Sequence, residues 1–153
     1  MSTPTLYITM GLPRSGKSTW ARSTGYPIVN RDAIRLALHG QTFLNAAEDM
    51  VSAIEEYMVR SLLLAGHTSV VVDATHLNPK HVNRWMEFNV QGIREPHVIP
   101  KQFPTGPAEC ISRAKADGRP DLVPVIESMF ERYIICNCWL ENDIDREEAT
   151  CRT

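Results

Sequence analysis

Short apolar runs and helical patterns alternate along this chain. The runs predict strands at residues 6–10, 28–29, 68–72 and 97–99, and the β-branched run at 68–72 lacks alternation, as expected of a strand covered on both faces. Apolar side chains three and four positions apart predict helices near residues 18–23, 31–40, 46–65, 80–90, 108–116 and from about 124 onward. The alternation is typical of an α/β fold with three layers, and we expect a mainly parallel sheet of four or five strands.

The longest predicted helix, residues 46–65, is amphipathic. We expect its apolar side chains to pack in the core rather than to bind a ligand; they are Met50, Val51, Ile54, Tyr57, Met58, Leu62 and Ala65. The charged residues that separate them are expected on the opposite face; they are Glu48, Asp49, Glu55, Glu56 and Arg60.

The first predicted strand leads into a segment with the spacing G-x-x-x-x-G-K-[ST]. Its two glycines let the backbone approach an anion closely, Lys17 adds a positive charge, and Ser18 offers a hydroxyl to Mg²⁺. A glycine-containing turn is the alternative, but the strand before the motif and the Ser-Thr continuation favour a phosphate-binding loop. We therefore predict that the following residues bind a nucleotide: Gly11, Leu12, Pro13, Arg14, Ser15, Gly16, Lys17, Ser18 and Thr19.

A second candidate feature follows the strand at residues 28–29. Asn30 can cap the next helix, and Asp32 and Arg35 are three residues apart, on one face of its first turns. They follow the carboxyl end of a strand, where open α/β sheets bind ligands. A second interpretation stays open for each residue, because a carboxylate near a helix N-terminus is favourable in itself and a helix arginine commonly forms a surface ion pair.

Asp73 ends the predicted strand at residues 68–72. An aspartate in this position after a phosphate loop is typical of a carboxylate beside a metal ion or its waters, and we predict that Asp73 and Ser18 serve the metal. A turn residue at a strand end is the alternative. The histidines have no metal-ligand spacing, and we expect all of them to be surface or loop residues: His39, His67, His76, His81 and His97.

A basic stretch lies beside a Gly/Pro loop near the C-terminal end of the predicted core. Its cations are Arg113, Lys115 and Arg119. Cations beside a loop that can move are suited to a lid over a triphosphate, because the transferred phosphoryl group needs positive charge around it. The alternative is a set of solvated cations that favour a helix C-terminus.

The composition is that of an ordinary globular protein, with 153 residues, 43% hydrophobic and 22% charged. We expect one domain at residues 1–140 and an acidic tail at residues 141–153. A net charge of −2 excludes a protein that coats nucleic acid with a broad basic surface, but not one that binds a strand end. Four cysteines lack zinc-site spacing and are expected to be reduced thiols: Cys110, Cys136, Cys138 and Cys151.

No apolar run has the length of a membrane span, and no signal-peptide pattern opens the chain. We therefore expect a cytoplasmic protein without a membrane partner. The sequence leaves the oligomeric state open and is compatible with an oligomer.

Four blocks of residues, in this order, resemble the kinase domain of phage-type polynucleotide 5′-kinases, and the resemblance runs from residue 5 to about 134. The blocks are residues 11–22, Asn30-Arg31-Asp32 with Arg35, residues 73–79 and residues 123–129. Many kinases share the phosphate loop, whereas Asn-Arg-Asp with an arginine three residues later is the discriminating block. The resemblance implies a P-loop kinase that uses ATP and Mg²⁺ and phosphorylates the 5′-hydroxyl end of DNA or RNA, for end repair.

The resemblance also implies roles for the acceptor side. Asp32 matches the general base that takes the proton of the 5′-hydroxyl, and Arg35 matches the arginine that holds the adjacent phosphate of the acceptor. Both roles suit a carboxylate and a cation on the same helical turn.

On the donor side, the resemblance assigns ATP and Mg²⁺ to Lys17, Ser18 and Thr19, and it places Asp73 at the active site. Arg113 matches the first of two lid arginines. The second would fall at Asp117, so we expect Arg119 to supply that charge.

Two other functions stay open. A small-molecule kinase would act on the hydroxyl of a sugar, nucleoside or antibiotic, and a nucleotide-dependent switch would transfer phosphate to no acceptor. The guanine-binding block Asn-Lys-x-Asp is absent, which speaks against a GTPase. The phosphatase motif Asp-x-Asp-Gly-Thr of larger relatives is also absent, so we expect no 3′-phosphatase activity.

Overall fold

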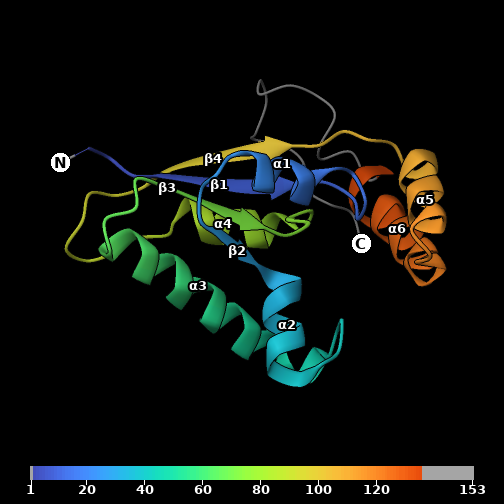
Figure 1. The fold of residues 1–153 in the computed structure, drawn as a ribbon, viewed down its shortest axis with the longest axis horizontal. Coiled ribbons are helices and arrows are strands. Elements are labelled where there is room, and N and C mark those ends of the chain that lie inside the picture. Colours follow the sequence, from blue (N-terminus) through green and yellow to red (C-terminus); the bar gives the residue numbers. More distant parts are fainter. Residues whose placement is uncertain (1, 136–153) are drawn as a thin grey trace. The chain divides into compact units, whose positions relative to one another are not determined.

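The computed structural model describes residues 2–135 of the chain (Figure 1). Its described residues divide into two units, one made of residues 2–11 and 16–103 and the other of residues 12–15 and 104–135. Within the phosphate loop, residues 12–15 therefore belong to the second unit, whereas Gly11 and residues 16–19 belong to the first. The predicted acidic tail, 141–153, and three of the cysteines, Cys136, Cys138 and Cys151, lie outside the described residues.

The first unit contains a four-stranded sheet in which every strand pair is parallel. Its strands are β1 (Thr5–Met10), β2 (Ile28–Asn30), β3 (Ser69–Asp73) and β4 (His97–Gln102), in the order β2-β3-β1-β4. This confirms the predicted α/β fold and settles the strand number at four among the described residues. The carboxyl ends of the strands share one edge of the sheet, where Asn30 pairs with Asp73 in register.

Both faces of the sheet are covered. Consecutive residues of a strand point to opposite faces, and Val70, Val71 and Val72 of β3 are all fully buried. Burial on both faces explains why β3 is a continuous apolar run, whereas the edge strand β4 is largely exposed.

Four helices belong to this unit: α1 (Lys17–Ser23), α2 (Arg31–His39), α3 (Glu48–Leu64) and α4 (Pro79–Met86), with a short 3₁₀ helix, η1 (Asn45–Ala47), before α3. Two of them start at asparagine caps. The side-chain oxygen of Asn30 accepts from the backbone N–H of Ala33 at 2.7 Å, and that of Asn78 accepts from Lys80 at 3.0 Å. The cap at Asn30 defines the start of α2 and therefore the position of Asp32 within its first turn.

The expectation for the core face of α3 was wrong for three of its members. Met50, Tyr57 and Met58 are 52%, 70% and 37% exposed, so they are not core residues. Val51 is buried as expected, and the other buried residues of α3 are Glu55, Val59 and Leu63. The prediction failed because a glutamate occupies the core face, where arginines from two other helices pair with it.

The second unit contains α5 (Pro107–Ala116), a 3₁₀ turn, η2 (Pro120–Leu122), α6 (Val123–Met129) and a π-helical turn, η3 (Phe130–Ile135). Helices α5 and α6 pack against each other, and Cys110, Ala114 and Ile126 are fully buried in this unit. Among residues 2–135, no helix combines the length and the apolar character needed to cross a membrane.

Candidate active site

The phosphate loop begins at Gly11, directly after β1, and its second glycine, Gly16, directly precedes α1. Gly16 stands at φ 101°, a left-handed conformation that an L side chain rarely adopts, so the loop requires glycine here. No side chain caps the N-terminus of α1. Lys17, the first residue of this helix, is 7% exposed, and its burial is typical of a lysine held at the base of a phosphate loop.

Asp73 is the centre of a hydrogen-bond cluster at the carboxyl edge of the sheet. Its Oδ2 accepts from the Ser18 hydroxyl at 2.7 Å and from the Asn30 amide at 2.9 Å, while Thr9 Oγ1 lies 3.2 Å from its Oδ1. The carboxylate is 4% exposed. The cluster joins three neighbouring strands and the start of α1, and it brings together the two residues predicted to serve a metal.

The donor set of this cluster fits Mg²⁺. The hydroxyl of Ser18 and the carboxylate of Asp73 are hard oxygen ligands, and the described residues contain no group of three or more His, Cys, Asp or Glu that could hold a metal ion on its own. Mg²⁺ in nucleotide sites characteristically takes one or two protein oxygens and completes its shell with phosphates and water. Ser18 and Asp73 are therefore the residues that would hold it.

Asp32 and Arg35 lie together on α2, as their spacing predicted. Arg35 Nη1 donates to Asp32 Oδ1 at 2.7 Å, and the Asp32 side chain is 76% exposed. The guanidinium also donates from Nε and Nη2 to the two carboxylate oxygens of Glu48, each at 2.8 Å. Asp32 thus keeps one accessible oxygen while Arg35 restrains the other.

The pairing with Glu48 is strong for both partners. The hydrogen bond from Arg35, helped by Arg31, lowers the pKa of Glu48 to about 2 in spite of partial burial. Burial alone would lower the pKa of Arg35, but the hydrogen bonds and charges of Glu48 and Asp32 raise it above its ordinary value. Arg35 is therefore a fixed cation rather than a mobile surface side chain.

A buried ion-pair network behind α2 was not indicated by the sequence pattern. Arg31 is 9% exposed, and it donates to Glu55 at 2.9 Å, to Glu48 at 3.0 Å and to Ser52 at 2.9 Å. Glu55 also accepts from Arg84 of α4 at 2.6 Å. The signal that could have revealed it is the placement of Glu48, Ser52 and Glu55 on the same helical face as Val51.

His76 also departs from expectation. It lies in the loop after β3, as predicted, but it is 3% exposed and has φ 45°, which is unusual for a residue other than glycine. Its Nδ1 lies 2.7 Å from the carbonyl oxygen of Thr9. A carbonyl only accepts, so Nδ1 carries the proton, and burial lowers the pKa of His76 to about 4.

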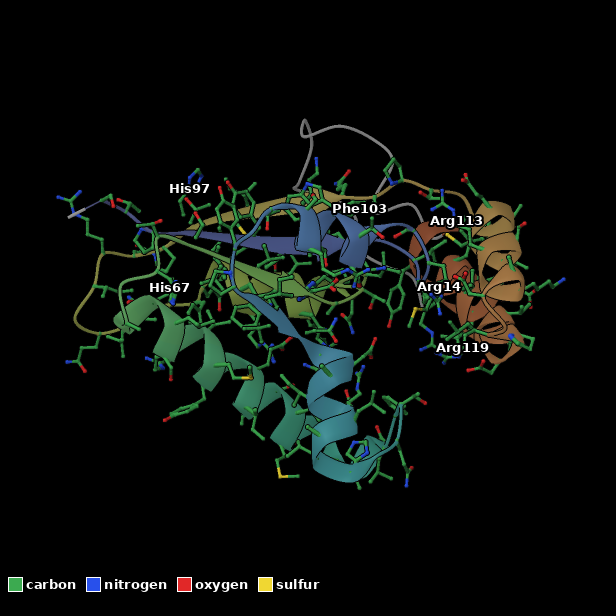
Figure 2. The ribbon with its side chains drawn as sticks, viewed as in Figure 1. Arg14, His67, His97, Phe103, Arg113 and Arg119 are labelled. Atoms are coloured by element: carbon green, nitrogen blue, oxygen red, sulfur yellow. The ribbon has the colours of Figure 1, made fainter. Side chains whose placement is uncertain are left out.

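The second unit holds the predicted lid cations, of which Arg113 and Arg119 are labelled in Figure 2. Arg113 Nη1 donates to the carbonyl oxygen of Arg14 at 3.2 Å, and Arg113 also pairs with Glu109. Arg113 is therefore in contact with the central part of the phosphate loop.

Arg119 is differently engaged. Its Nε and Nη2 donate to the two carboxylate oxygens of Asp121 at 2.9 and 2.8 Å, and this contact lowers the pKa of Asp121. Asp117 stands where a second lid arginine was expected, and it pairs with Arg14 Nη1 at 3.1 Å.

A family model described as an AAA domain matches residues 6–133. A solved chain of a Pnkp1/Rnl/Hen1 complex is 28% identical with a TM-score of 0.63, and the match covers 74% of this chain and 40% of that one. A chain of the Pnkp1/Rnl/Hen1 RNA repair complex is 23% identical with a TM-score of 0.62, covering 87% and 47%. A gluconokinase from Sinorhizobium meliloti 1021 is 19% identical with a TM-score of 0.51, covering 86% and 75%.

This chain spans less than half the length of the two chains from the Pnkp1/Rnl/Hen1 complexes, at 40% and 47%. The match at 23% identity and the gluconokinase match at 19% identity show the fold alone. The family model covers residues 6–133, nearly all of the described residues. This range includes the phosphate loop and the whole parallel sheet. The chain belongs to the AAA domain family, and its fold is that of a P-loop kinase domain.

Proposed function

We propose that this protein is an ATP-dependent polynucleotide 5′-hydroxyl kinase that acts in nucleic acid end repair. The observation that carries the proposal is the chain of contacts from the phosphate loop to α2. Ser18 donates to Asp73, Asp73 accepts from Asn30, and Asn30 caps the helix turn that bears Asp32. This chain of hydrogen bonds ties the candidate base to the candidate donor site at the same edge of the sheet.

The donor side needs positive charge and a metal. Lys17 would bind the β- and γ-phosphates of ATP, and the loop backbone would hold the remaining oxygens. Mg²⁺ held by Ser18 and Asp73 would neutralise the charge that develops on the triphosphate. Arg113 is the lid cation that supports the same task, because it contacts the loop at Arg14.

The acceptor side needs a base and an anchor. Asp32 takes the proton of the 5′-hydroxyl as the O5′–P bond forms and the bond from the γ-phosphorus to the β-phosphate oxygen breaks, which releases ADP. Arg35 uses three of its five N–H donors on Asp32 and Glu48. The other two would bind the phosphate that follows the acceptor's first nucleotide.

One further contact favours a polynucleotide over a small alcohol. Phe43 is 58% exposed, and the guanidinium of Arg35 lies 5.6 Å from the centre of its ring. An exposed aromatic ring beside a phosphate-binding cation is the arrangement on which nucleic acid bases stack. A sugar kinase has no need of such a surface, although a nucleoside acceptor would also use it.

A transfer assay tests the proposal. The full chain is incubated with labelled ATP and Mg²⁺, and the acceptors are a 5′-hydroxyl oligonucleotide, the same oligonucleotide with a 5′-phosphate, a nucleoside and a panel of sugars. We expect label on the 5′-hydroxyl oligonucleotide alone. Transfer to a sugar or nucleoside in preference to the oligonucleotide would identify a small-molecule kinase, and transfer to none of them would favour a nucleotide-dependent switch.

A further inference from the structure

Asn30 uses both ends of its side-chain amide. Its Oδ1 accepts from the backbone N–H of Ala33 at 2.7 Å, and its Nδ2 donates to Asp73 Oδ2 at 2.9 Å. A backbone N–H can only donate and an ionised carboxylate can only accept, so the two partners together fix the orientation of the amide. Asn30 therefore joins the start of α2 to the carboxylate that we assign to the metal site.

The register of two strands brings this amide and this carboxylate together. Asn30 ends β2, Asp73 ends β3, and the two residues are partners in the parallel pairing. Because register partners on neighbouring strands point to the same face of the sheet, the contact is built into the sheet itself. A hydrogen bond to an ionised group is among the stronger kinds, and Asp73 is buried, so water competes little for this carboxylate.

Capping of α2 does not by itself require asparagine at position 30. Serine, aspartate and asparagine cap helices about equally well, because each offers a side-chain oxygen to the first turn. Aspartate here would turn a second carboxylate toward Asp73, and serine has no second polar atom with which to reach it. Of these three residue types, only asparagine accepts from the helix and donates to the carboxylate at the same time.

We propose that Asn30 is a positioning residue for Mg²⁺, in addition to its role as a helix cap. Its amide and the Ser18 hydroxyl both donate to Oδ2 of Asp73, and together they hold this carboxylate in one orientation before the ion binds. Groups that hold a metal ligand in this way typically contribute 10- to 100-fold to metal affinity. The inference rests on the proposed function only in that Ser18 and Asp73 bind Mg²⁺ with ATP, and it is independent of the acceptor.

ATP affinity, measured by titration calorimetry on the full chain without acceptor, tests the proposal across a Mg²⁺ series and in EDTA. Asn30→Ser keeps an oxygen for the cap and removes the donor to Asp73, whereas Asn30→Ala removes both. We expect both variants to need about tenfold more Mg²⁺ for half of the metal-dependent gain in ATP affinity. Their ATP affinity in EDTA should stay within about twofold of the wild type. Only Asn30→Ala should also have a clearly lower urea midpoint, because it alone loses the cap.

Asn78→Ser is the matched control, because Asn78 caps α4 through the same kind of contact, to the backbone N–H of Lys80 at 3.0 Å. It should leave the Mg²⁺ dependence of ATP binding unchanged. A wild-type Mg²⁺ dependence in Asn30→Ser would overturn the proposal, because Asn30 would then act as a helix cap alone. An equal shift in Asn78→Ser would also overturn it, since any altered cap would then suffice. None of these measurements uses an oligonucleotide, so a failure of the proposed acceptor is recognised separately in the transfer assay.

Discussion

The hydroxyl of Ser18 donates to Asp73 Oδ2 over 2.7 Å and thereby joins the first turn of α1 to the end of β3. The two residues are far apart in the sequence, and the parallel pairing of β1 with β3 brings them together. In the same cluster Asn30 contacts the same carboxylate oxygen, so one aspartate organises both the loop and the start of α2. The donor and acceptor halves of the proposed site are therefore coupled through Asp73.

Replacing Asp73 by asparagine should impair the use of Mg²⁺. The amide removes the negative charge that would attract the ion, and we expect the Mg²⁺ concentration for half-maximal transfer to rise by roughly 10- to 100-fold. Initial rates of phosphoryl transfer across a Mg²⁺ series measure this. Asp49→Asn, at an exposed carboxylate in the first turn of α3, is the matched control. An unchanged Mg²⁺ requirement in Asp73→Asn would exclude this residue from the metal site.

Glu55 should contribute far more to stability than its neighbour Glu56. Glu55 is fully buried between Arg31 and Arg84, so Glu55→Gln leaves two arginines without their shared countercharge and should lower the free energy of unfolding by about 3 kcal/mol. Glu56 forms a longer, more exposed pair with Arg84 at 3.3 Å, and Glu56→Gln should cost less than about 1 kcal/mol. Urea unfolding of both variants gives the comparison, and equal losses would mean that the buried network is not a structural support of α2.

His76 should make the protein less stable in mild acid. Its pKa is lowered to about 4 in the fold, so between that value and about 6.5 the unfolded chain binds the proton more readily. The contribution of His76 therefore falls as the pH drops through this window, by up to about 1.4 kcal/mol per pH unit. His76→Asn keeps a donor for the Thr9 carbonyl, tolerates positive φ and does not titrate.

The pH dependence of urea unfolding between pH 6.5 and 5 should thus be shallower in His76→Asn than in the wild type. The contribution of Glu48 is constant in this range, because that carboxylate, with its pKa lowered to about 2, stabilises the fold fully above about 4.5 and loses its effect only as the pH falls further. Identical slopes for the two proteins would show that His76 is not held in its neutral form.

Phe43 should matter for an oligonucleotide acceptor. Base stacking on an aromatic side chain contributes about 1–3 kcal/mol, so Phe43→Ala should raise the KM for the oligonucleotide by roughly tenfold with little change in the KM for ATP. Tyr57→Ala is the control, because Tyr57 is a 70% exposed aromatic residue on α3, whereas the ring beside Arg35 is that of Phe43. Equal effects of the two substitutions would remove the argument for a base-stacking surface.

Much of the fold could be predicted because its central strands, β1 and β3, are largely buried. Val70, Val71 and Val72 form a continuous apolar run that only a covered parallel strand explains well, and Asp73 marks its end. The glycine and lysine spacing of the phosphate loop likewise follows from backbone geometry. These features depend on neighbours in the sequence, and they could be inferred without knowledge of long-range contacts.

Other features depend on contacts between distant residues and could not be inferred. A hydrophobic pattern places Glu55 on the solvent face of α3, whereas Arg31 and Arg84 make its burial favourable. His76 is buried because its ring reaches the Thr9 carbonyl, and the ion pair of Arg14 with Asp117 joins two loops remote in sequence. In each case the partner of a polar side chain lies far away in the sequence, so a local pattern does not reveal the contact.

The central claim is that Asp32 accepts the proton of a 5′-hydroxyl while the phosphate loop holds ATP. Asp32→Asn tests it most directly, because the amide keeps the shape of the side chain and Glu48 still restrains Arg35. Transfer of labelled phosphate from ATP to a 5′-hydroxyl oligonucleotide should fall by about 10²- to 10⁴-fold in kcat, while the Kd for ATP stays within about twofold of the wild type. A kcat close to that of the wild type, with ATP binding intact, would contradict the assignment of Asp32 as the base.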